Sequence, residues 1–178
     1  DIGGTLRFAG DRANRIDPNN VWIGERVEER GITYKILDYV DTYNPDIVGD
    51  IHNLPLVDAS QEAVVCIAVL EHVENPIKAA AELYRVLKPG GVCFVYVPFL
   101  YYYHAHKGYF GDYWRFTEDS TRSMFAPFSS IELMPVRGPL ATLLHLSPIG
   151  RYRVVLHIGF MLDRVLGKSA SKQVSGYY

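Results

Sequence analysis

Two uninterrupted apolar runs, separated by a helix signal, constrain the fold of this chain more than any other feature. Residues 63–70 and 92–97 are almost wholly apolar, and both runs have the length of strands that are covered on both faces. Between them, Asn75 and Pro76 are residue types that begin a helix, and Lys-Pro-Gly-Gly at 88–91 ends it. Parallel strands need such a crossover, so this segment predicts a right-handed strand, helix, strand unit.

Strand and helix patterns alternate along the rest of the chain. Short strands are expected at residues 32–37, 46–48 and 130–136, and helices at 21–30, 117–125, 139–146 and 151–166. The alternation predicts an α/β fold with a doubly wound, mostly parallel sheet and helices on both faces. In the crossover helix, spacing places Ile77, Ala80 and Tyr84 on the buried face. The final helix carries an apolar stripe, which we expect to pack on the sheet rather than in a membrane interface.

Composition favours a single soluble domain, which we place at residues 1–178. Cys66 and Cys93 lie in apolar runs, which favours buried, reduced thiols and a cytoplasmic location. A net charge of -2 argues against a nucleic-acid partner, and no apolar stretch is long enough to predict a membrane span. The chain begins at Asp1 rather than at methionine, and its last residues, 176–178, resemble the start of a strand, so we expect a fragment clipped at both ends.

Acidic residues follow two of the predicted strands. Asp38 ends the strand at 32–37, and Asp50 follows the next one. In an open parallel sheet, ligands bind beyond the carboxyl ends of the strands. There Asp38 can accept hydrogen bonds from both hydroxyls of a ribose, and Asp50 from an adenine amine, while Ile51 and Tyr39 pack on the purine. Turn formation is the alternative role of either aspartate alone, but the two together in this order favour a nucleoside ligand.

Four motifs occur in order along the chain. They are Asp-Ile-Gly-Gly at 1–4, Pro-Asp-Ile-Val-Gly-Asp-Ile-His-Asn-Leu-Pro at 45–55, Val-Leu-Glu-His-Val at 69–73, and Glu-Leu-Tyr-Arg-Val-Leu-Lys-Pro-Gly-Gly at 82–91. Together they resemble the class I S-adenosylmethionine (SAM) dependent methyltransferases of type 11, the UbiE-like group. The resemblance covers about residues 32–137. It implies a Rossmann-like fold, SAM as the cofactor, and an enzyme that transfers a methyl group to a small-molecule acceptor.

The resemblance also assigns a cofactor site. Asp38 would bind the ribose, Asp50 and Ile51 the adenine, and residues 68–70 the wall beside the methionine moiety. The expected cofactor-binding residues are Asp1, Gly3, Gly4, Asp38, Tyr39, Asp50, Ile51, His52, Ala68 and Val69. The first loop departs from the family pattern, because Thr-Leu-Arg at 5–7 follows the glycine pair where further glycines are usual. An insertion and a partly missing first strand are the two explanations.

An aromatic and histidine-rich segment follows the apolar run at 92–97, and so lies at the same edge of the predicted sheet. If the acceptor is a hydroxyl or an amine, its proton must be removed by a base, and the candidate catalytic residues are His72, His104 and His106. The candidate substrate-binding residues are Tyr101, Tyr103, Tyr113, Trp114 and Arg115. Capping of the turn before Asn75 is the alternative role for His72, and pairing with an acid is the alternative for Arg115.

Other sequence features bear on alternative functions of the chain. His104 and His106 are two residues apart with Asp112 nearby, but there is no clear third ligand at a set spacing, so we expect no metal site there. A nicotinamide-dependent oxidoreductase would need Gly-x-Gly-x-x-Gly in residues 1–10, which lack it. A non-catalytic nucleoside-binding or scaffold domain is the other alternative. Gly-Lys-Ser at 167–169 follows a helix and lacks the first glycine of a phosphate loop, so it is interpreted as a helix end. The acceptor and the oligomeric state are not indicated by the sequence.

Overall fold

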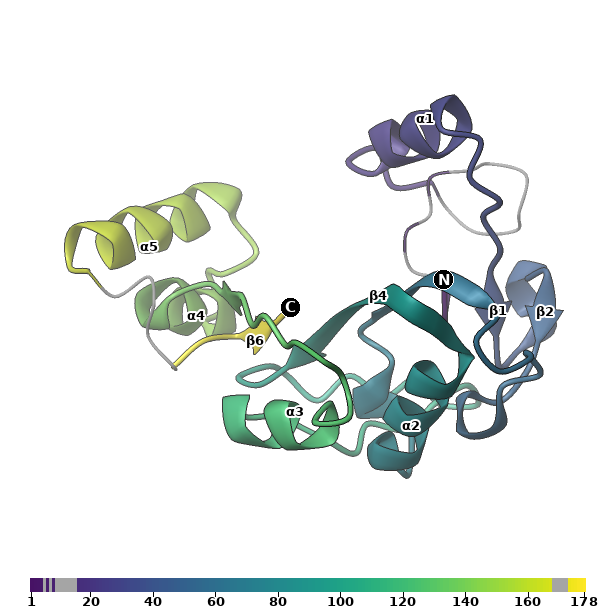
Figure 1. Cartoon of the computed structure of the whole chain (residues 1–178). Coiled ribbons are helices and arrows are strands. Elements are labelled where there is room, and N and C mark those ends of the chain that lie inside the picture. The colour runs from purple at the N-terminus through teal and green to yellow at the C-terminus, as the bar shows by residue number, and fades with distance from the viewer. Residues whose placement is uncertain (5, 7, 9–15, 168–172) are drawn as a thin grey trace. The chain divides into compact units, whose positions relative to one another are not determined.

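The computed structural model describes residues 1–4, 6, 8, 16–167 and 173–178 (Figure 1). The chain divides into two compact units, of which the first contains residues 1–69 and 77–94 and the second residues 70–76 and 95–178. The chain enters each unit twice, so the division does not follow a linker, and a single domain over residues 1–178 stays a prediction. The Thr-Leu-Arg departure in the first loop and the Lys-Ser pair at 168–169 lie wholly or partly outside the described residues.

Parallel pairing organises the first unit. β1 (Leu37–Asp38) pairs in parallel with β2 (Ile47–Val48). Ile2 forms parallel bridges to Leu37 on one side and to Cys66 of β3 (Gln61–Ile67) on the other. The spatial order is therefore β2, β1, Ile2, β3, with the first part of β4 (Leu87–Pro98) beside β3. Because Ile2 comes first in the chain but lies between β1 and β3, the chain order reverses at Ile2, where open α/β sheets bind ligands.

The helices of the first unit are α1 (Val21–Glu29), two short 3-10 turns η1 (Asp41–Tyr43) and η2 (Ile51–Asn53), and most of α2 (Pro76–Val86). The buried residues of α2 are Pro76, Ala79, Ala80, Leu83 and Val86. Ile77 and Tyr84 are exposed, so the face expected from the sequence was wrong for these two residues. Ala79 and Ala80 leave space for close packing, and the buried stripe is therefore centred on Leu83.

The strands of the first unit are also less covered than the apolar runs predicted. Val92 and Phe94 of β4 are exposed, and so is Ala63 of β3. Helix α1 buries none of its residues and therefore covers no sheet face in the way that a packed helix would. The expectation that both faces are covered along these two strands is thus wrong at these positions.

The second unit adds an antiparallel edge. Its elements are the 3-10 turn η3 (Leu70–His72), the end of β4, α3 (Glu118–Met124), β5 (Pro135–Val136), α4 (Pro139–Leu146), α5 (Arg153–Val165) and β6 (Gly176–Tyr177). Strand β6 is antiparallel to β4 and to β5, with Tyr177 opposite Val97 and Pro135. The strand expected at the end of the chain is confirmed. The fold is α/β and Rossmann-like, as the sequence predicted, with a sheet that is mixed at this edge.

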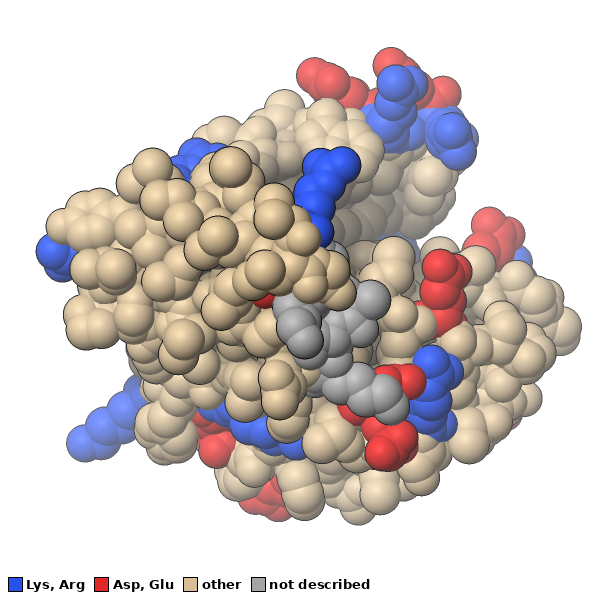
Figure 2. Space-filling view, turned by 90° about the vertical axis from the view of Figure 1, so that its left-hand side faces the viewer, with Lys and Arg blue, Asp and Glu red and all other residues tan. Residues whose placement is uncertain are grey.

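Helix α5 packs on α4 rather than on the sheet, as the two adjacent ribbons in Figure 1 show. Its buried residues are Gly159, next to Ala141, and Asp163, whose carboxylate accepts hydrogen bonds from the first turn of α4. The apolar stripe, including Val154 and Ile158, is exposed, which corrects the expected packing on the sheet. Figure 2 shows few charged side chains on the side of the molecule where these helices lie. Among the described residues, no helix has the length and apolar character to cross a bilayer.

Candidate functional site

Three segments leave the carboxyl ends of the strands around the reversal point of the first unit. Gly3 and Gly4 follow Ile2, Asp38 ends β1, and Ala68 follows β3. Gly3 and Gly4 have φ values of 80° and 55°, which glycine adopts without strain. A Cβ on Gly4 would lie 3.1 Å from Ile36 Cγ2 and 3.9 Å from Asp38 Oδ2. The glycine therefore keeps the space beside the Asp38 carboxylate open.

Asp38 is held by its own turn and presents a free acceptor. Its Oδ1 accepts a hydrogen bond from Val40 N at 3.2 Å, and its backbone carbonyl accepts one from Gly49 N at 2.9 Å. Asp38 is half-buried, and neighbouring Tyr39 is 70% exposed. An exposed ring next to a strand-end carboxylate is the arrangement expected for a ribose and purine site.

Asp50 caps the turn that follows β2. Its Oδ1 accepts from His52 N at 2.8 Å and lies 2.7 Å from His52 Nδ1. The backbone hydrogen bond, followed by the imidazole of His52, lowers the pKa of Asp50. The turn role named as the alternative is therefore real, but the carboxylate remains exposed and retains lone pairs for a ligand. Ile51 is buried beside it.

Asp1 and the residues after β3 complete the expected cofactor side. Asp1 Oδ2 accepts hydrogen bonds from Tyr34 Oη and Leu6 N, whereas Oδ1 is buried without a partner among the described residues. An unpartnered buried carboxylate oxygen fits a ligand that carries a cation, such as an amino group. Ala68 has a left-handed φ of 55°, and Val69 beside it is half-buried. These features fit SAM, which has a nucleoside at one end and an amino acid at the other.

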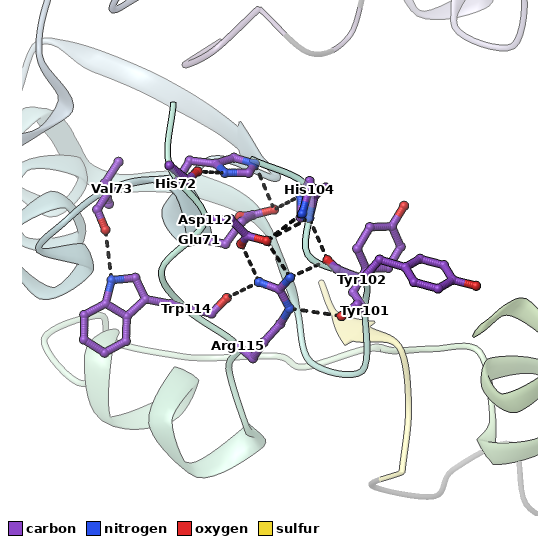
Figure 3. Close-up of polar contacts among 10 residues, drawn as sticks. Glu71, His72, Val73, Tyr101, Tyr102, His104, Asp112, Trp114 and Arg115 are labelled. Carbon is purple, nitrogen blue, oxygen red and sulfur yellow. Dashed lines mark hydrogen bonds and ion pairs between the residues drawn. The ribbon is translucent and has the colours of Figure 1, made fainter. Parts of the chain in front are cut away.

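The second unit brings together Glu71, His72 and His104 (Figure 3). Glu71 and His72 lie on η3, and His104 comes from the aromatic segment after β4. The backbone carbonyl of Glu71 accepts hydrogen bonds from Tyr113 N at 2.8 Å and Trp114 N at 3.3 Å, which fixes this segment against η3. Glu71 is 1% exposed, and burial raises its pKa to about 7. We call these three residues the Glu71 cluster.

The two imidazoles of the cluster are oriented by backbone carbonyls. His72 Nδ1 lies 2.6 Å from Gly111 O, and His104 Nδ1 lies 2.9 Å from Tyr102 O. The Nε2 atoms of both rings face Glu71 Oε1, at 3.9 Å for His72 and 3.7 Å for His104. Burial lowers the pKa of His72. The cluster is therefore a set of acceptor atoms that converge from two segments of the chain.

Asp112 and Arg115 form a half-buried ion pair beside the cluster. Arg115 donates from both terminal nitrogens to the Asp112 carboxylate, at 2.6 and 2.8 Å, and also to the carbonyls of Tyr101, Tyr102 and Trp114. These hydrogen bonds hold the pKa of Asp112 at about 2. Asp112 Oδ2 also accepts from His104 N at 2.8 Å. The alternative for Arg115, pairing with an acid, is what the structure shows, and its role in substrate binding stays a prediction.

The remaining expected acceptor residues lie around the cluster or are exposed near it. Tyr101 stacks on His145 and meets the His104 ring edge-on. Trp114 Nε1 donates to Val73 O at 2.9 Å, and Tyr103 and Tyr113 are exposed. The structure does not place His106 in the cluster; its ring packs on Tyr109, and its backbone bridges to Phe110.

Sequence reasoning missed two functional groups. From the sequence, Glu71 is assigned no role of its own and is only part of the motif at 69–73. Asp112 is considered only as a possible metal ligand near His104 and His106. A signal for Glu71 was present, because an acid directly after a buried strand is placed at the ligand-binding edge of the sheet. A signal for the pair was also present, since Asp112 and Arg115 are three residues apart.

Comparison with known proteins supports the methyltransferase reading. Residues 12–95 match the family model described as a methyltransferase domain. The chain is 44% identical over 50 residues to a probable SAM-dependent methyltransferase of Mycolicibacterium smegmatis, a match covering 28% of the chain and 20% of that protein. It is 52% identical over 44 residues to an uncharacterized 37.1 kDa protein in transposon TN4556 of Streptomyces fradiae, covering 25% of the chain and 13% of that protein.

Solved structures share this likeness at low identity. A SAM-dependent methyltransferase of Thermotoga maritima, described as a possible histamine N-methyltransferase, has a TM-score of 0.41 and 18% identity, and the match covers 67% of this chain and 56% of that one. Because the chain spans a fifth or less of the curated relatives named above, it corresponds to only part of such proteins. Residues 12–95 of the chain are therefore similar to a methyltransferase domain, and the relative from Mycolicibacterium smegmatis is described as a probable SAM-dependent enzyme, in agreement with the resemblance of the sequence motifs.

Proposed function

We propose that this chain transfers a methyl group from SAM to a small-molecule acceptor, with the nucleoside held in the first unit. The observation that carries the proposal is the reversal of chain order at Ile2, with Gly3, Gly4 and the Asp38 carboxylate around it. Bound SAM supplies an activated methyl group on a sulfonium. The protein's task is therefore to bind, orient and exclude water rather than to activate the donor.

Each expected cofactor residue then has a definite task. Asp38 accepts hydrogen bonds from the ribose hydroxyls, and Asp50 accepts one from the adenine amine. Tyr39, Ile51 and His52 surround the purine. The rest of the set, which lies around the methionine moiety, is Asp1, Gly3, Gly4, Ala68 and Val69.

For the acceptor we propose the Glu71 cluster and the aromatic residues near it. Val69, assigned to the methionine wall, is two positions before Glu71 in the chain. His72 and His104 line the position of the acceptor's nucleophilic atom, and His106 is the third candidate but lies outside the cluster. Tyr101, Tyr103, Tyr113 and Trp114 supply apolar and hydrogen-bonding walls, as in other small-molecule sites. Arg115, whose guanidinium is occupied by Asp112 and carbonyls, holds this segment in place.

Composition supports a small acceptor and a cytoplasmic location. The chain has a net charge of -2, which gives no broad basic face for a nucleic acid. Cys66 is buried and Cys93 is half-buried, neither forms a disulfide, and burial raises the pKa of Cys93 to about 12. Unreacted thiols of this kind are usual in a reducing compartment.

Calorimetric titration with SAM and with NAD tests the cofactor. We expect heat of binding with SAM and none with NAD, because the first loop lacks the dinucleotide-binding glycines. Binding of NAD alone would place the chain among oxidoreductases. No heat with either ligand would favour a scaffold domain of the same fold.

A further inference from the structure

Glu71 is a buried carboxylate with less hydrogen bonding than such a group requires. It is 1% exposed, and its Oε2 is buried without a hydrogen-bond partner among the described residues. Its Oε1 faces His72 Nε2 at 3.9 Å and His104 Nε2 at 3.7 Å, which are both longer than a hydrogen bond. A buried charge is stable only when it is paired or when it binds a metal ion. Among the described residues, no cation therefore hydrogen-bonds to the Glu71 carboxylate, although the Arg115 guanidinium lies nearby.

The tautomers of the two imidazoles show that neither ring donates a hydrogen bond to Glu71. His72 Nδ1 and His104 Nδ1 each lie at hydrogen-bonding distance from a backbone carbonyl, at Gly111 and Tyr102. A carbonyl only accepts, so each Nδ1 carries the hydrogen, and each neutral ring presents an unprotonated Nε2. Two nitrogen lone pairs and a carboxylate oxygen thus converge with no donor between them. Such an arrangement is repulsive unless a cation or a proton lies between these atoms.

The geometry matches that of a metal site with three protein ligands. The candidate ligand atoms of Glu71, His72 and His104 all lie within 4.8 Å of one another. Tetrahedral zinc with N and O ligands at about 2.1 Å places those ligands about 3.4 Å from each other. The observed 3.7 and 3.9 Å exceed this value by a few tenths of an ångström, which small side-chain rotations would remove.

The outer contacts also match. Metal-binding histidines usually donate their second ring nitrogen to a carbonyl or a carboxylate, which fixes the ring orientation. Both rings do so here, and Asp112 Oδ2 lies 3.4 Å from His104 Nδ1 as a second partner. Arg115, the nearby cation, is bound to Asp112 and to carbonyls, and Glu71 Oε2 has no hydrogen bond from it.

We propose that Glu71 Oε1, His72 Nε2 and His104 Nε2 bind a divalent transition-metal ion, with Zn²⁺ the best match, and leave one coordination position open. The set of two histidines and one glutamate with an open position is a zinc arrangement known from catalytic sites. From the sequence alone, His104 is grouped with His106, with Asp112 nearby, and no clear third ligand is apparent. In the structure the further ligands come from η3.

Metal binding does not depend on SAM, whereas its use in catalysis rests on the proposed function. The open position would take an oxygen, nitrogen or sulfur atom of the acceptor. A Lewis acid there would make deprotonation of that atom easier before it attacks the methyl carbon. The proton would leave to solvent, and the electron pair of the broken methyl–sulfur bond would stay on the sulfur of S-adenosylhomocysteine.

The test is calorimetry with ZnCl₂ on the full chain after dialysis against a chelator, together with metal analysis of the dialysed complex. We expect one Zn²⁺ per chain. Loss of an outer partner typically costs 10- to 100-fold in metal affinity, so Glu71→Gln and His104→Gln should each weaken binding by at least about 100-fold. His157→Gln is the matched control, because His157 also bonds a carbonyl through Nδ1 but lies exposed on α5, and it should bind as the unaltered protein does.

Two measurements exclude trivial explanations. The metal-free Glu71→Gln protein should unfold at the same temperature as the unaltered protein or higher, because an uncompensated carboxylate is removed, and added Zn²⁺ should no longer raise that temperature. No bound zinc, or a zinc affinity in Glu71→Gln or His104→Gln equal to that of the unaltered protein, would overturn the proposal, as would loss of zinc binding in His157→Gln. Calorimetry with SAM on the same samples distinguishes the zinc site from the proposed methyltransferase function. A protein that binds zinc but not SAM would contradict only the proposed function.

Discussion

The acids of the first unit and Glu71 of the second unit are solvated in opposite ways. Asp38 and Asp50 stand at strand ends, accept hydrogen bonds from backbone N–H groups of their own turns, and keep part of each carboxylate accessible. Glu71 is buried against two imidazoles that present lone pairs. The first arrangement is stable with or without a ligand, whereas the second needs a cation or a proton.

This difference indicates different tasks. A carboxylate that is already hydrogen-bonded can take a neutral hydroxyl or amine with little reorganisation, which suits recognition of a nucleoside. A carboxylate without enough partners stores an unfavourable interaction that a bound group relieves. We therefore propose that Asp38 and Asp50 bind uncharged groups of the cofactor, whereas Glu71, like Asp1 Oδ1, requires a positively charged partner.

The largest effect is expected at Arg115. Arg115→Ala would leave the Asp112 carboxylate, which is 0% exposed, without its bidentate partner. Breaking a buried pair by removing one member costs about 3 kcal/mol or more, and the low end applies because the Arg115 side chain is 25% exposed. Urea unfolding should show this loss. Arg122→Ala, which removes an exposed pair with Glu118, is the control and should cost less than about 1 kcal/mol. Equal losses would mean that Asp112 is not held by charge.

A comparable effect, on binding rather than stability, is expected at Asp38. Asp38→Ala removes the acceptor for two ribose hydroxyls, so SAM affinity should fall by roughly 1.5–3 kcal/mol, or about 10- to 150-fold. Stability should change little, because Val40 N loses only one long hydrogen bond of 3.2 Å. Asp41→Ala, an exposed acid in the next turn, should leave affinity unchanged. Unaltered SAM affinity in Asp38→Ala would remove the ribose assignment.

A smaller effect is expected at Asp50. Its carboxylate already serves His52, so Asp50→Asn keeps an oxygen acceptor for the backbone N–H and loses only the charge toward the adenine amine. We expect SAM affinity to fall by about 1 kcal/mol, or roughly fivefold. Affinity for adenosine alone should fall by the same factor. A loss seen with SAM but not with adenosine would move Asp50 away from the purine.

The sequence predicted the acids of the first unit because local patterns place them. An apolar run that ends in an acid puts that acid at the edge of a parallel sheet, whatever the rest of the chain does. The sequence did not predict the Glu71 cluster, because the cluster depends on long-range contacts of irregular backbone. His104 reaches Glu71 through a segment that is held by Tyr113 N, Trp114 N and the Gly111 carbonyl, and none of these leaves a periodic pattern.

Helix α5 shows the same limit in the packing. Its existence followed from the apolar stripe, but its partner did not, because the fully buried residues of the helix are Gly159 and Asp163, whereas Val155 and Leu156 one turn earlier are only half-buried. Gly159 allows the approach, since a Cβ there would lie 2.6 Å from Ala141 Cα, and Asp163 caps the first turn of α4. A glycine and an aspartate are typical of a solvent-exposed helix face. The hydrophobic spacing therefore predicted that the other side of α5 is buried.

The smallest effect is expected at Glu82. It tests how much a partly exposed ion pair of the first unit contributes to the free energy of unfolding. Glu82 pairs with Arg85 and accepts a hydrogen bond from Leu54 N at 2.8 Å, and these contacts lower its pKa, with Arg85 the main cause. A lowered folded-state pKa adds stability that is present above the unfolded value and lost as pH falls through the folded value. Glu82→Gln should therefore lower the free energy of unfolding at pH 7 by no more than about 1 kcal/mol, and the difference should shrink as pH falls through the lowered folded-state pKa of Glu82.

Thermal unfolding of the two proteins between pH 3 and pH 7 measures this difference. Glu62→Gln is the control, because Glu62 pairs with Lys88 while its side chain is 84% exposed, and screening should leave almost no effect at any pH. A Glu82→Gln difference that persists at pH 3 would show that packing around the Arg85 network, rather than its charge, stabilises this region. In that event the stability of the first unit would depend on a structured polar network, as that of the second unit does. The two units would then differ only in how deeply their acids are buried.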